Sequence, residues 1–157
     1  MHKSYLIPLL LMATLMSRAT AQMQSEATAI ENISAKEGFK VELLYTVPKE
    51  KFGSWVNLCV DDKNRIIASD QFGGLYRFPA PKEGSNLDET TIQKVPADIR
   101  AANGLLWAFG ALYVAVNDYE KKMESGVYKL TDSNGDDKLD KVEKLRGMQA
   151  RGDHGVH

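Results

Sequence analysis

Hydrophobic and polar residues alternate in short runs along most of this 157-residue chain. The runs are rich in β-branched and aromatic residues and end at Gly, Pro, Asn or Asp, which is typical of strands joined by turns. No stretch repeats apolar residues at the 3.6-residue spacing of a helix. The pattern predicts an all-β fold, with strands at residues 39–47, 55–61, 65–70, 73–78, 91–95, 105–109, 111–118, 126–130 and 141–147.

The strand pattern repeats. Residues 57–70 ("NLCVDDKNRIIASD") align without gaps to residues 105–118 ("LLWAFGALYVAVND"), so that Asp70 falls on Asp118. A four-strand unit that recurs about every 50 residues is typical of the blades of a β-propeller. A β-sandwich is the competing fold, because turns at this spacing fit it too, but the repeat favours the propeller.

We therefore predict two four-stranded blades, at residues 53–100 and 101–148, and the start of a third. Closing a propeller takes about four to eight blades. The predicted propeller, residues 38–157, is thus incomplete, and we expect the chain to be part of a longer one. A ring assembled from several short chains is the alternative.

The first 21 residues have the features of a signal peptide. Lys3 supplies a positive start, residues 5–16 are apolar, and Ala19 and Ala21 suit a cleavage site after Ala21. The apolar run is short for a spanning helix, although a retained anchor is the alternative. We expect an exported protein, periplasmic or extracellular, with no membrane span after cleavage and a polar leader at residues 22–37.

Charge and cysteine content narrow the function classes. Cleavage would remove two basic residues and no acid, which leaves 18 basic and 21 acidic residues and a net charge of −3. This balance argues against nucleic acid as a partner. Cys59 is the only cysteine, so the chain has no internal disulfide, and its apolar surroundings favour a buried side chain over a nucleophile.

An acidic stretch, "DSNGDDKLDKVE" (132–143), follows the spacing of an EF-hand calcium loop. Positions 1, 3, 5, 9 and 12 are Asp132, Asn134, Asp136, Asp140 and Glu143. Position 6, normally Gly, is Asp137, and strands rather than helices flank the loop. The stretch predicts a calcium site that pins a hairpin; the alternative is a solvated turn.

The last seven residues, "RGDHGVH" (151–157), hold two of the three histidines beside a carboxylate. A His with an acidic neighbour can act as a general base, because the carboxylate orients the ring and raises its pKa. Two histidines at this spacing could also share a metal if the backbone were helical. A polar loop between blades is the alternative. In a propeller this stretch leads to the innermost strand of a third blade, which favours His154, His157 and Asp153 as catalytic candidates.

Four stretches carry a resemblance to a known family. In order, they read "GSWVNLCVDDKNRIIASDQFGGLYRF", "NGLLWAFGALYVAVND", "GVYKLTDSNGDDKLDKVEKLRG" and "GDHGVH". Residues 38–157 resemble the N-terminal propeller of large exported bacterial proteins described as membrane-bound or sorbosone-type dehydrogenases. That fold is similar to soluble pyrroloquinoline-quinone (PQQ) sugar dehydrogenases.

The resemblance implies an exported dehydrogenase that oxidises a sugar or other alcohol and passes electrons to a quinone and a cytochrome c. The family stretch G-E/D-H-G-x-H matches residues 152–157 and implies that His154, with His157 second, takes a proton from the substrate hydroxyl. The family's acidic hairpin, D-x-D-G-D-G, matches residues 132–137 with one amide and one Asp out of pattern. Residues that hold PQQ and its metal would lie in later blades.

The resemblance also implies a partner and an alternative. Family members often add a c-type cytochrome domain with a CxxCH haem motif, and this chain has no such motif. The competing function is a non-catalytic, calcium-stabilised module that binds a carbohydrate or a protein. In either case we expect these 157 residues alone to show no dehydrogenase activity.

Overall fold

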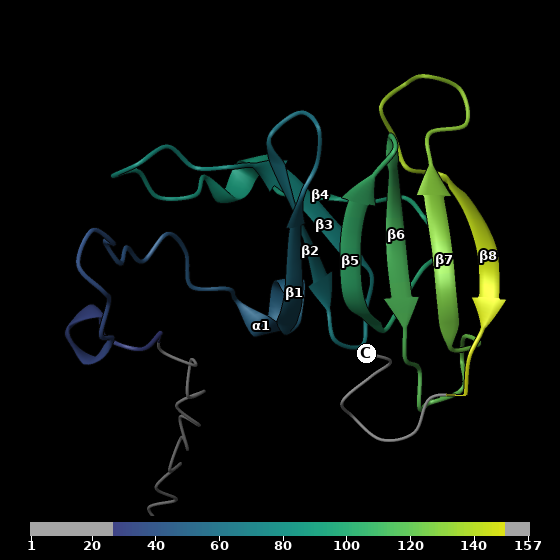
Figure 1. The fold of residues 1–157 in the computed structure, drawn as a ribbon, viewed down its shortest axis with the longest axis horizontal. Helices are drawn as coiled ribbons and strands as arrows, with labels where there is room; N and C mark the ends of the chain where they lie inside the picture. Colours follow the sequence, from purple (N-terminus) through teal and green to yellow (C-terminus); the bar gives the residue numbers. More distant parts are fainter. Residues whose placement is uncertain (1–26, 150–157) are drawn as a thin grey trace, which may run out of the picture.

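Two four-stranded antiparallel sheets make up most of the computed structural model, which describes residues 27–149 (Figure 1). The predicted all-β class is therefore confirmed. Sheet 1 contains β1 (Trp55–Val60), β2 (Arg65–Asp70), β3 (Leu75–Pro79) and β4 (Gln93–Lys94). Sheet 2 contains β5 (Ala102–Ala108), β6 (Ala111–Val116), β7 (Gly126–Thr131) and β8 (Lys141–Gly147). The short helices are η1 (Ile30–Asn32), α1 (Lys49–Phe52) and η2 (Glu89–Thr91).

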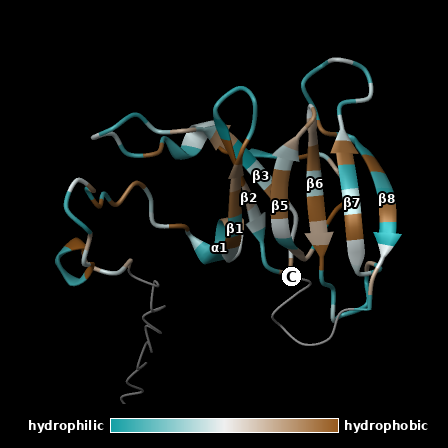
Figure 2. Cartoon of the chain, in the orientation of Figure 1, coloured by the Kyte–Doolittle hydropathy of each residue, from teal (hydrophilic) through white to brown (hydrophobic). Residues whose placement is uncertain are grey.

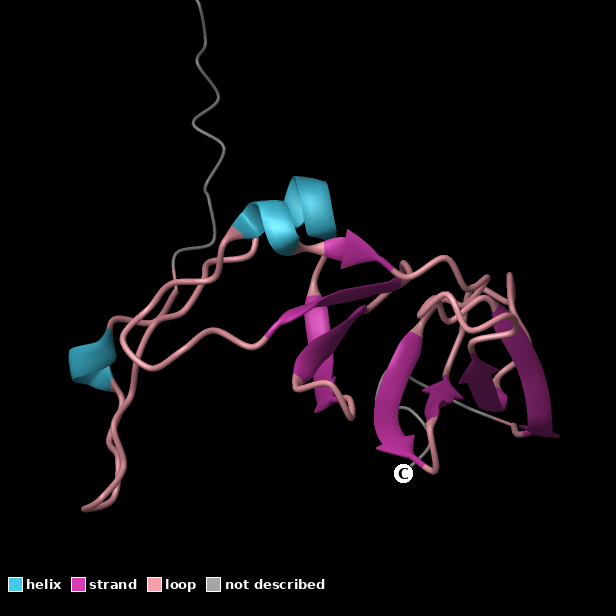
Figure 3. Ribbon diagram, turned by 90° about the horizontal axis from the view of Figure 1, so that it is seen from above, coloured by secondary structure: helices cyan, strands magenta, loops and turns pink. Residues whose placement is uncertain are grey.

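The hydrophobic core lies between the two sheets. β7 buries alternate residues, and β2, β3 and β6 also contribute buried residues. Hydrophobic positions of β5 to β7 are brown in Figure 2. Side chains that are fully buried there include Ile67 and Leu75 from sheet 1 and Leu112, Val114 and Leu130 from sheet 2. Viewed from above, the sheets form two neighbouring layers, and β5 is the strand of sheet 2 that contacts β1 (Figure 3).

The strand register shows how the two sheets correspond. Each begins with a bulge in its first strand pair, between Trp55 and Asn57 in sheet 1 and between Ala102 and Gly104 in sheet 2. Trp55 lies opposite Asp70, whereas Ala102 lies opposite Val116. The gapless alignment of Asp70 with Asp118 is therefore wrong as a strand register.

Different turns account for one of the two positions of this shift, and the first strands are already displaced by the other. The turn from β1 to β2 spans residues 61–64, whereas β5 and β6 are joined by only Phe109 and Gly110. Both of these residues have positive φ, 52° and 69°, as a two-residue hairpin turn requires.

The predicted strand at residues 39–47 is also wrong. This segment has the right composition for a strand, but no strand lies beside it in register. A backbone hydrogen bond joins the Leu87 N–H to the Leu44 carbonyl at 2.9 Å. The apolar side chains Leu44 and Tyr45 instead pack beside Trp55 on sheet 1.

The remaining sequence predictions fall partly outside the described residues. The predicted signal peptide lies outside them, and so does the start of the leader. Within residues 27–149, no helix has the length and apolar character needed to cross a membrane.

Candidate functional site

Carboxylates of the acidic loop between β7 and β8 hold the loop's own backbone. Asp132 accepts N–H bonds from Asn134, Gly135 and Asp137 at distances of 3.0, 2.7 and 2.7 Å. Burial would raise the pKa of Asp132, but these hydrogen bonds outweigh it and lower the pKa. Asp132 thus acts as a turn-forming residue in this conformation.

Two further predicted calcium ligands, Asp136 and Asp140, also accept hydrogen bonds from donors inside the loop. Asp140 accepts from the backbone N–H and the hydroxyl of Ser133, at 2.9 and 2.7 Å. Asp136 accepts from the backbone N–H and the ammonium group of Lys138, at 3.1 and 2.8 Å. The loop is therefore ordered by hydrogen bonds between its own residues.

Asp137, the residue in the EF-hand glycine position, connects the loop to sheet 1. Its φ is 66°, in the region that favours Gly, and its carboxylate accepts two bonds from the Arg65 guanidinium at 2.5 and 2.9 Å. Its carbonyl accepts from Arg77 at 2.6 Å, and Lys63 lies 2.9 Å from its carboxylate. These bonds from Arg65, and then from Lys63, hold the pKa of Asp137 well below its usual range.

Arg65 also pairs with a buried carboxylate in its own sheet. Asp61, whose side chain is fully buried, accepts from the Arg65 side chain at 2.7 Å. It also accepts the backbone N–H groups of Lys63 and Arg65. We call this network of Asp61, Lys63, Arg65, Arg77 and Asp137 the upper clamp, because it joins the two sheets at the upper end of Figure 1.

The structure does not gather the five predicted calcium ligands into one site. Glu143 lies in β8, opposite Lys129, rather than in the loop. No cluster of three or more His, Cys, Asp or Glu side chains suited to a metal occurs within residues 27–149. Cationic groups of Lys63, Arg65, Arg77 and Lys138 also contact the loop's acids and carbonyls. The described conformation thus fits calcium poorly, and calcium binding stays a prediction.

A second arginine joins the sheets at their lower end. Arg100, in the connection from β4 to β5, donates to the Phe72 carbonyl at 2.9 Å and to Glu120 at 2.6 Å. Its Nε lies 3.5 Å from the carboxylate of Asp118, whose side chain is 2% exposed. Phe72 and Tyr119 pack edge to face beside it, with ring centres 5.8 Å apart. We call this group the lower clamp.

Asp118 orders the loop that joins β6 to β7. Its carboxylate accepts the backbone N–H groups of Glu120, Lys122 and Met123 at 3.1, 3.1 and 2.8 Å. Asp70, at the end of β2, has a related role, since it accepts the Ser54 N–H at 3.0 Å. The two aspartates thus both cap lower-end loops, although they are not equivalent in strand register.

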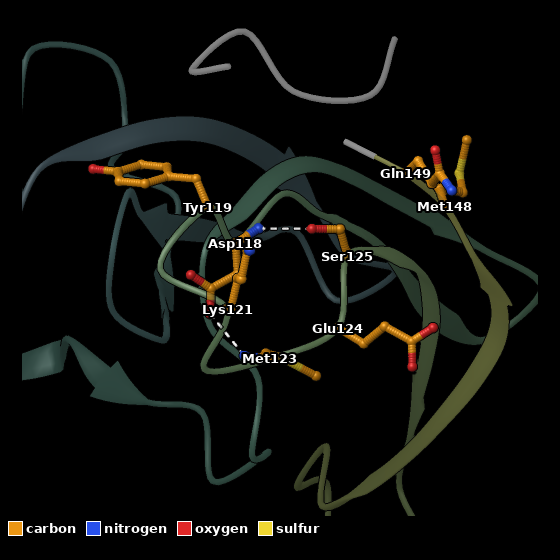
Figure 4. A pocket seen from close by; sticks show the side chains of 8 residues that line it. All are labelled: Asp118, Tyr119, Lys121, Met123, Glu124, Ser125, Met148 and Gln149. Carbon is orange, nitrogen blue, oxygen red and sulfur yellow. Dashed lines mark hydrogen bonds between the residues drawn. The ribbon is translucent and has the colours of Figure 1, made fainter. Parts of the chain in front are cut away.

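A hollow of about 570 Å³ opens beside this loop (Figure 4). Tyr119 lies on one side of it, and Met148 and Gln149 lie on the opposite side. Lys121 and Glu124 add charged groups to its lining. Aromatic, apolar and charged groups in one concave surface can accommodate a small polar molecule.

The predicted catalytic residues Asp153, His154 and His157 lie outside the described residues. The last described residue, Gln149, lines the hollow at the lower end. Sequence reasoning missed Arg65, Arg77 and Arg100. The partners Arg65 and Asp137 are 72 positions apart, and only the fold brings them together.

Cys59 lies in β1, half-buried against the core. Burial, and then the nearby negative charge of Asp61, raises the pKa of its thiol to about 11. The thiol is therefore protonated at neutral pH, which agrees with a packing role and opposes a nucleophilic one.

Comparisons with protein-family models, curated proteins and solved structures find no significant match to this chain. The fold and geometry above are therefore the basis for proposing a function.

Proposed function

We propose that the two sheets are consecutive blades of a β-propeller. The observation that supports this most is the repeated sheet: both have four strands in sequential order, and both begin with a bulged pair. The first strands, β1 and β5, lie next to each other, as the inner strands of neighbouring blades do. Both clamps then hold one blade to the next.

The function that we propose is an exported quinoprotein-like dehydrogenase that oxidises a sugar or other alcohol. The sequence resemblance supports the chemistry, and the hollow at the lower end supports that end as the ligand side. In this proposal His154 takes the proton from the substrate hydroxyl, Asp153 orients the ring, and His157 is the second candidate base. By the resemblance, a PQQ held by later blades would supply the redox chemistry, with a cytochrome c as the electron acceptor.

The residues described here do not provide a binding set for PQQ. Within residues 27–149, no group of three or more metal-ligating side chains is present. We therefore assign no quinone contact to these residues and derive no step through the quinone.

Dye-linked oxidation of glucose, sorbosone and other sugars, with and without PQQ and Ca²⁺, tests the proposal on the exported protein together with the later blades that the resemblance implies. We expect PQQ-dependent turnover that falls about 100-fold or more in His154→Ala and less in His157→Ala. Asp153→Asn should shift the pH profile of turnover, because the ring would lose its charged neighbour. Turnover that does not depend on PQQ, or that His154→Ala leaves unchanged, would contradict the assignment.

The second candidate is a non-catalytic, calcium-stabilised propeller that binds a carbohydrate or a protein. The ordered acidic loop is the observation that favours it, because one loop presents Asp132, Asp136 and Asp140. Isothermal titration with Ca²⁺ tests the metal, with Asp132→Asn as the control variant. Binding heat that the native protein gives and Asp132→Asn does not would favour the binding module, provided that PQQ-dependent turnover is also absent. No binding heat at millimolar Ca²⁺ would contradict the calcium prediction.

A further inference from the structure

Each sheet has an inner face, turned toward the other sheet, and an outer face. On sheet 1 the inner face contains Cys59, Ile67 and Leu75. On sheet 2 the inner face contains Leu105, Leu112, Val114, Tyr128 and Leu130. These residues form the interface that holds the protein together.

The strand register relates the outer face of sheet 2 to the inner face of sheet 1. With the bulged pairs superposed, Leu106 takes the place of Cys59, and Tyr113 takes the place of Ile67. Val127 similarly takes the place of Leu75. The outer face of sheet 2 therefore repeats the surface that sheet 1 uses to bind sheet 2.

The opposite relation holds for the outer face of sheet 1. Leu58 there corresponds to Leu105, and Ile66 and Phe78 correspond to Leu112 and Leu130. All three counterparts in sheet 2 pack into the core. One chain thus repeats the residue pattern of both halves of its own internal interface, on opposite sides.

Both outer faces are open at the strands that would meet first. Leu58 is 59% exposed and Val60 is 52% exposed on β1, and Leu106 is 60% exposed on β5. The chain itself covers the β3 part of the outer face of sheet 1, because Trp55 stacks on Phe78 and Phe52 packs edge to face against Tyr76. The part that stays open is the β1 part, with Leu58 and Val60. Within the chain, β1 and β5 are also the strands that join the two sheets.

A strained turn beside the open face of β5 supports an interface there. Phe109 has a φ of 52° and is 96% exposed. Asn, Asp or Gly suits such a position better, and a ring that is 96% exposed buries almost no apolar surface within this chain. Contact with a second molecule would bury this ring and give it a stabilising role.

Charge is also complementary between the two sides. Lys129, on the outer face of sheet 2, takes the place of Arg77, which binds the loop between β7 and β8. The corresponding connection in sheet 1, between β3 and β4, carries three acids, Glu83, Asp88 and Glu89, and one base, Lys82. A neighbouring sheet 1 would therefore bring acidic residues toward Lys129.

We propose that the outer face of sheet 2 binds the outer face of sheet 1 of a second copy of this chain, head to tail. This inference rests on the blade architecture of the proposed function, and it develops the alternative in which several short chains assemble the ring. Repeating one such contact generates a closed ring when the rotation permits. A ring of about four to eight sheets corresponds to two, three or four copies.

Light scattering coupled to size exclusion tests the proposal with two matched variants. Leu58→Asp disables one face, and Leu106→Asp disables the other, at side chains of nearly equal exposure. We expect the native chain to have a multiple of its single-chain mass and each variant to have the single-chain mass. An equimolar mixture of the variants should form a one-to-one dimer, because one intact pair of faces remains. Ile30→Asp, at an exposed apolar residue outside both faces, should leave assembly unchanged.

Phe109→Asn is a variant that separates assembly from folding. Asn followed by Gly suits this turn, so we expect a fold at least as stable as the native one and a weaker assembly. A single-chain mass for the native protein with a β-type circular dichroism spectrum would overturn the second-copy proposal and leave the blade architecture standing. Assembly that survives both Asp variants would overturn it as well. A helical spectrum would overturn both proposals.

Discussion

The upper and lower clamps join the same two sheets in different ways. In the upper clamp, Arg65 makes paired bonds to Asp137 and a further bond to the fully buried carboxylate of Asp61. In the lower clamp, Arg100 lies 3.5 Å from Asp118, whose carboxylate already accepts three backbone N–H groups. Asp61 accepts two backbone N–H groups as well. An arginine should nevertheless stabilise the interface more at the upper end, because Arg65 bonds the buried acid directly at 2.7 Å and also pairs with Asp137.

Removing the upper arginine should have the largest effect. Arg65→Met leaves Asp61 buried without its cationic partner and frees Asp137 from its paired bonds. We expect the free energy of unfolding to fall by about 3 kcal/mol, measured by urea denaturation. Arg65→Lys keeps the charge but loses the paired hydrogen bonds, so its free energy of unfolding should lie between those of Arg65→Met and the native protein. Equal stability of Arg65→Met and the native protein would contradict this account.

Removing the lower arginine should cost less. Arg100→Met breaks the bonds to Phe72 and Glu120, but the backbone N–H groups still satisfy Asp118. The expected loss is about 2 kcal/mol, close to that of one charge-assisted hydrogen bond. The same urea experiment measures it, with Lys122→Met as a control for the charge near Glu120. A loss larger than that of Arg65→Met would reverse the ranking of the clamps.

The sequence predicted much of the fold but little of this polar framework. Alternation and turn residues located eight strands, because those signals are local. The segment 39–47 has strand composition, but pairing depends on a neighbouring strand, which composition does not reveal. In the sequence, Asp137 is only a departure from the calcium-loop pattern, because the arginines that bind it are distant in sequence. The predicted sites at residues 153–157 lie outside the described residues and stay predictions.

The pH dependence of stability should distinguish the upper clamp further. The pKa of Asp137 is lowered on folding, so its contribution is present above the ordinary Asp value of 3.8. That contribution is lost as pH falls through the lower, folded value. Asp137→Asn should therefore cost about 1 kcal/mol at pH 7 and progressively less below about pH 4. Urea denaturation at pH 7 and pH 3 measures both; a difference that is constant with pH would exclude the charge as the cause.

The smallest predicted effect concerns a strained backbone conformation that occurs in both the lower and the upper loop. Lys121, in the lower loop, and Asp137, in the upper loop, have φ values of 57° and 66°, where Gly is favoured. Lys121→Gly should stabilise the protein by about 0.5 kcal/mol, because the relieved strain exceeds the added chain entropy. Asp137→Gly relieves a similar strain but removes the bonds to Arg65, so it should destabilise the protein. Thermal unfolding of the two variants should thus shift in opposite directions. A shift in the same direction would mean that backbone conformation, rather than the arginine pairing, determines the residue preferred at position 137.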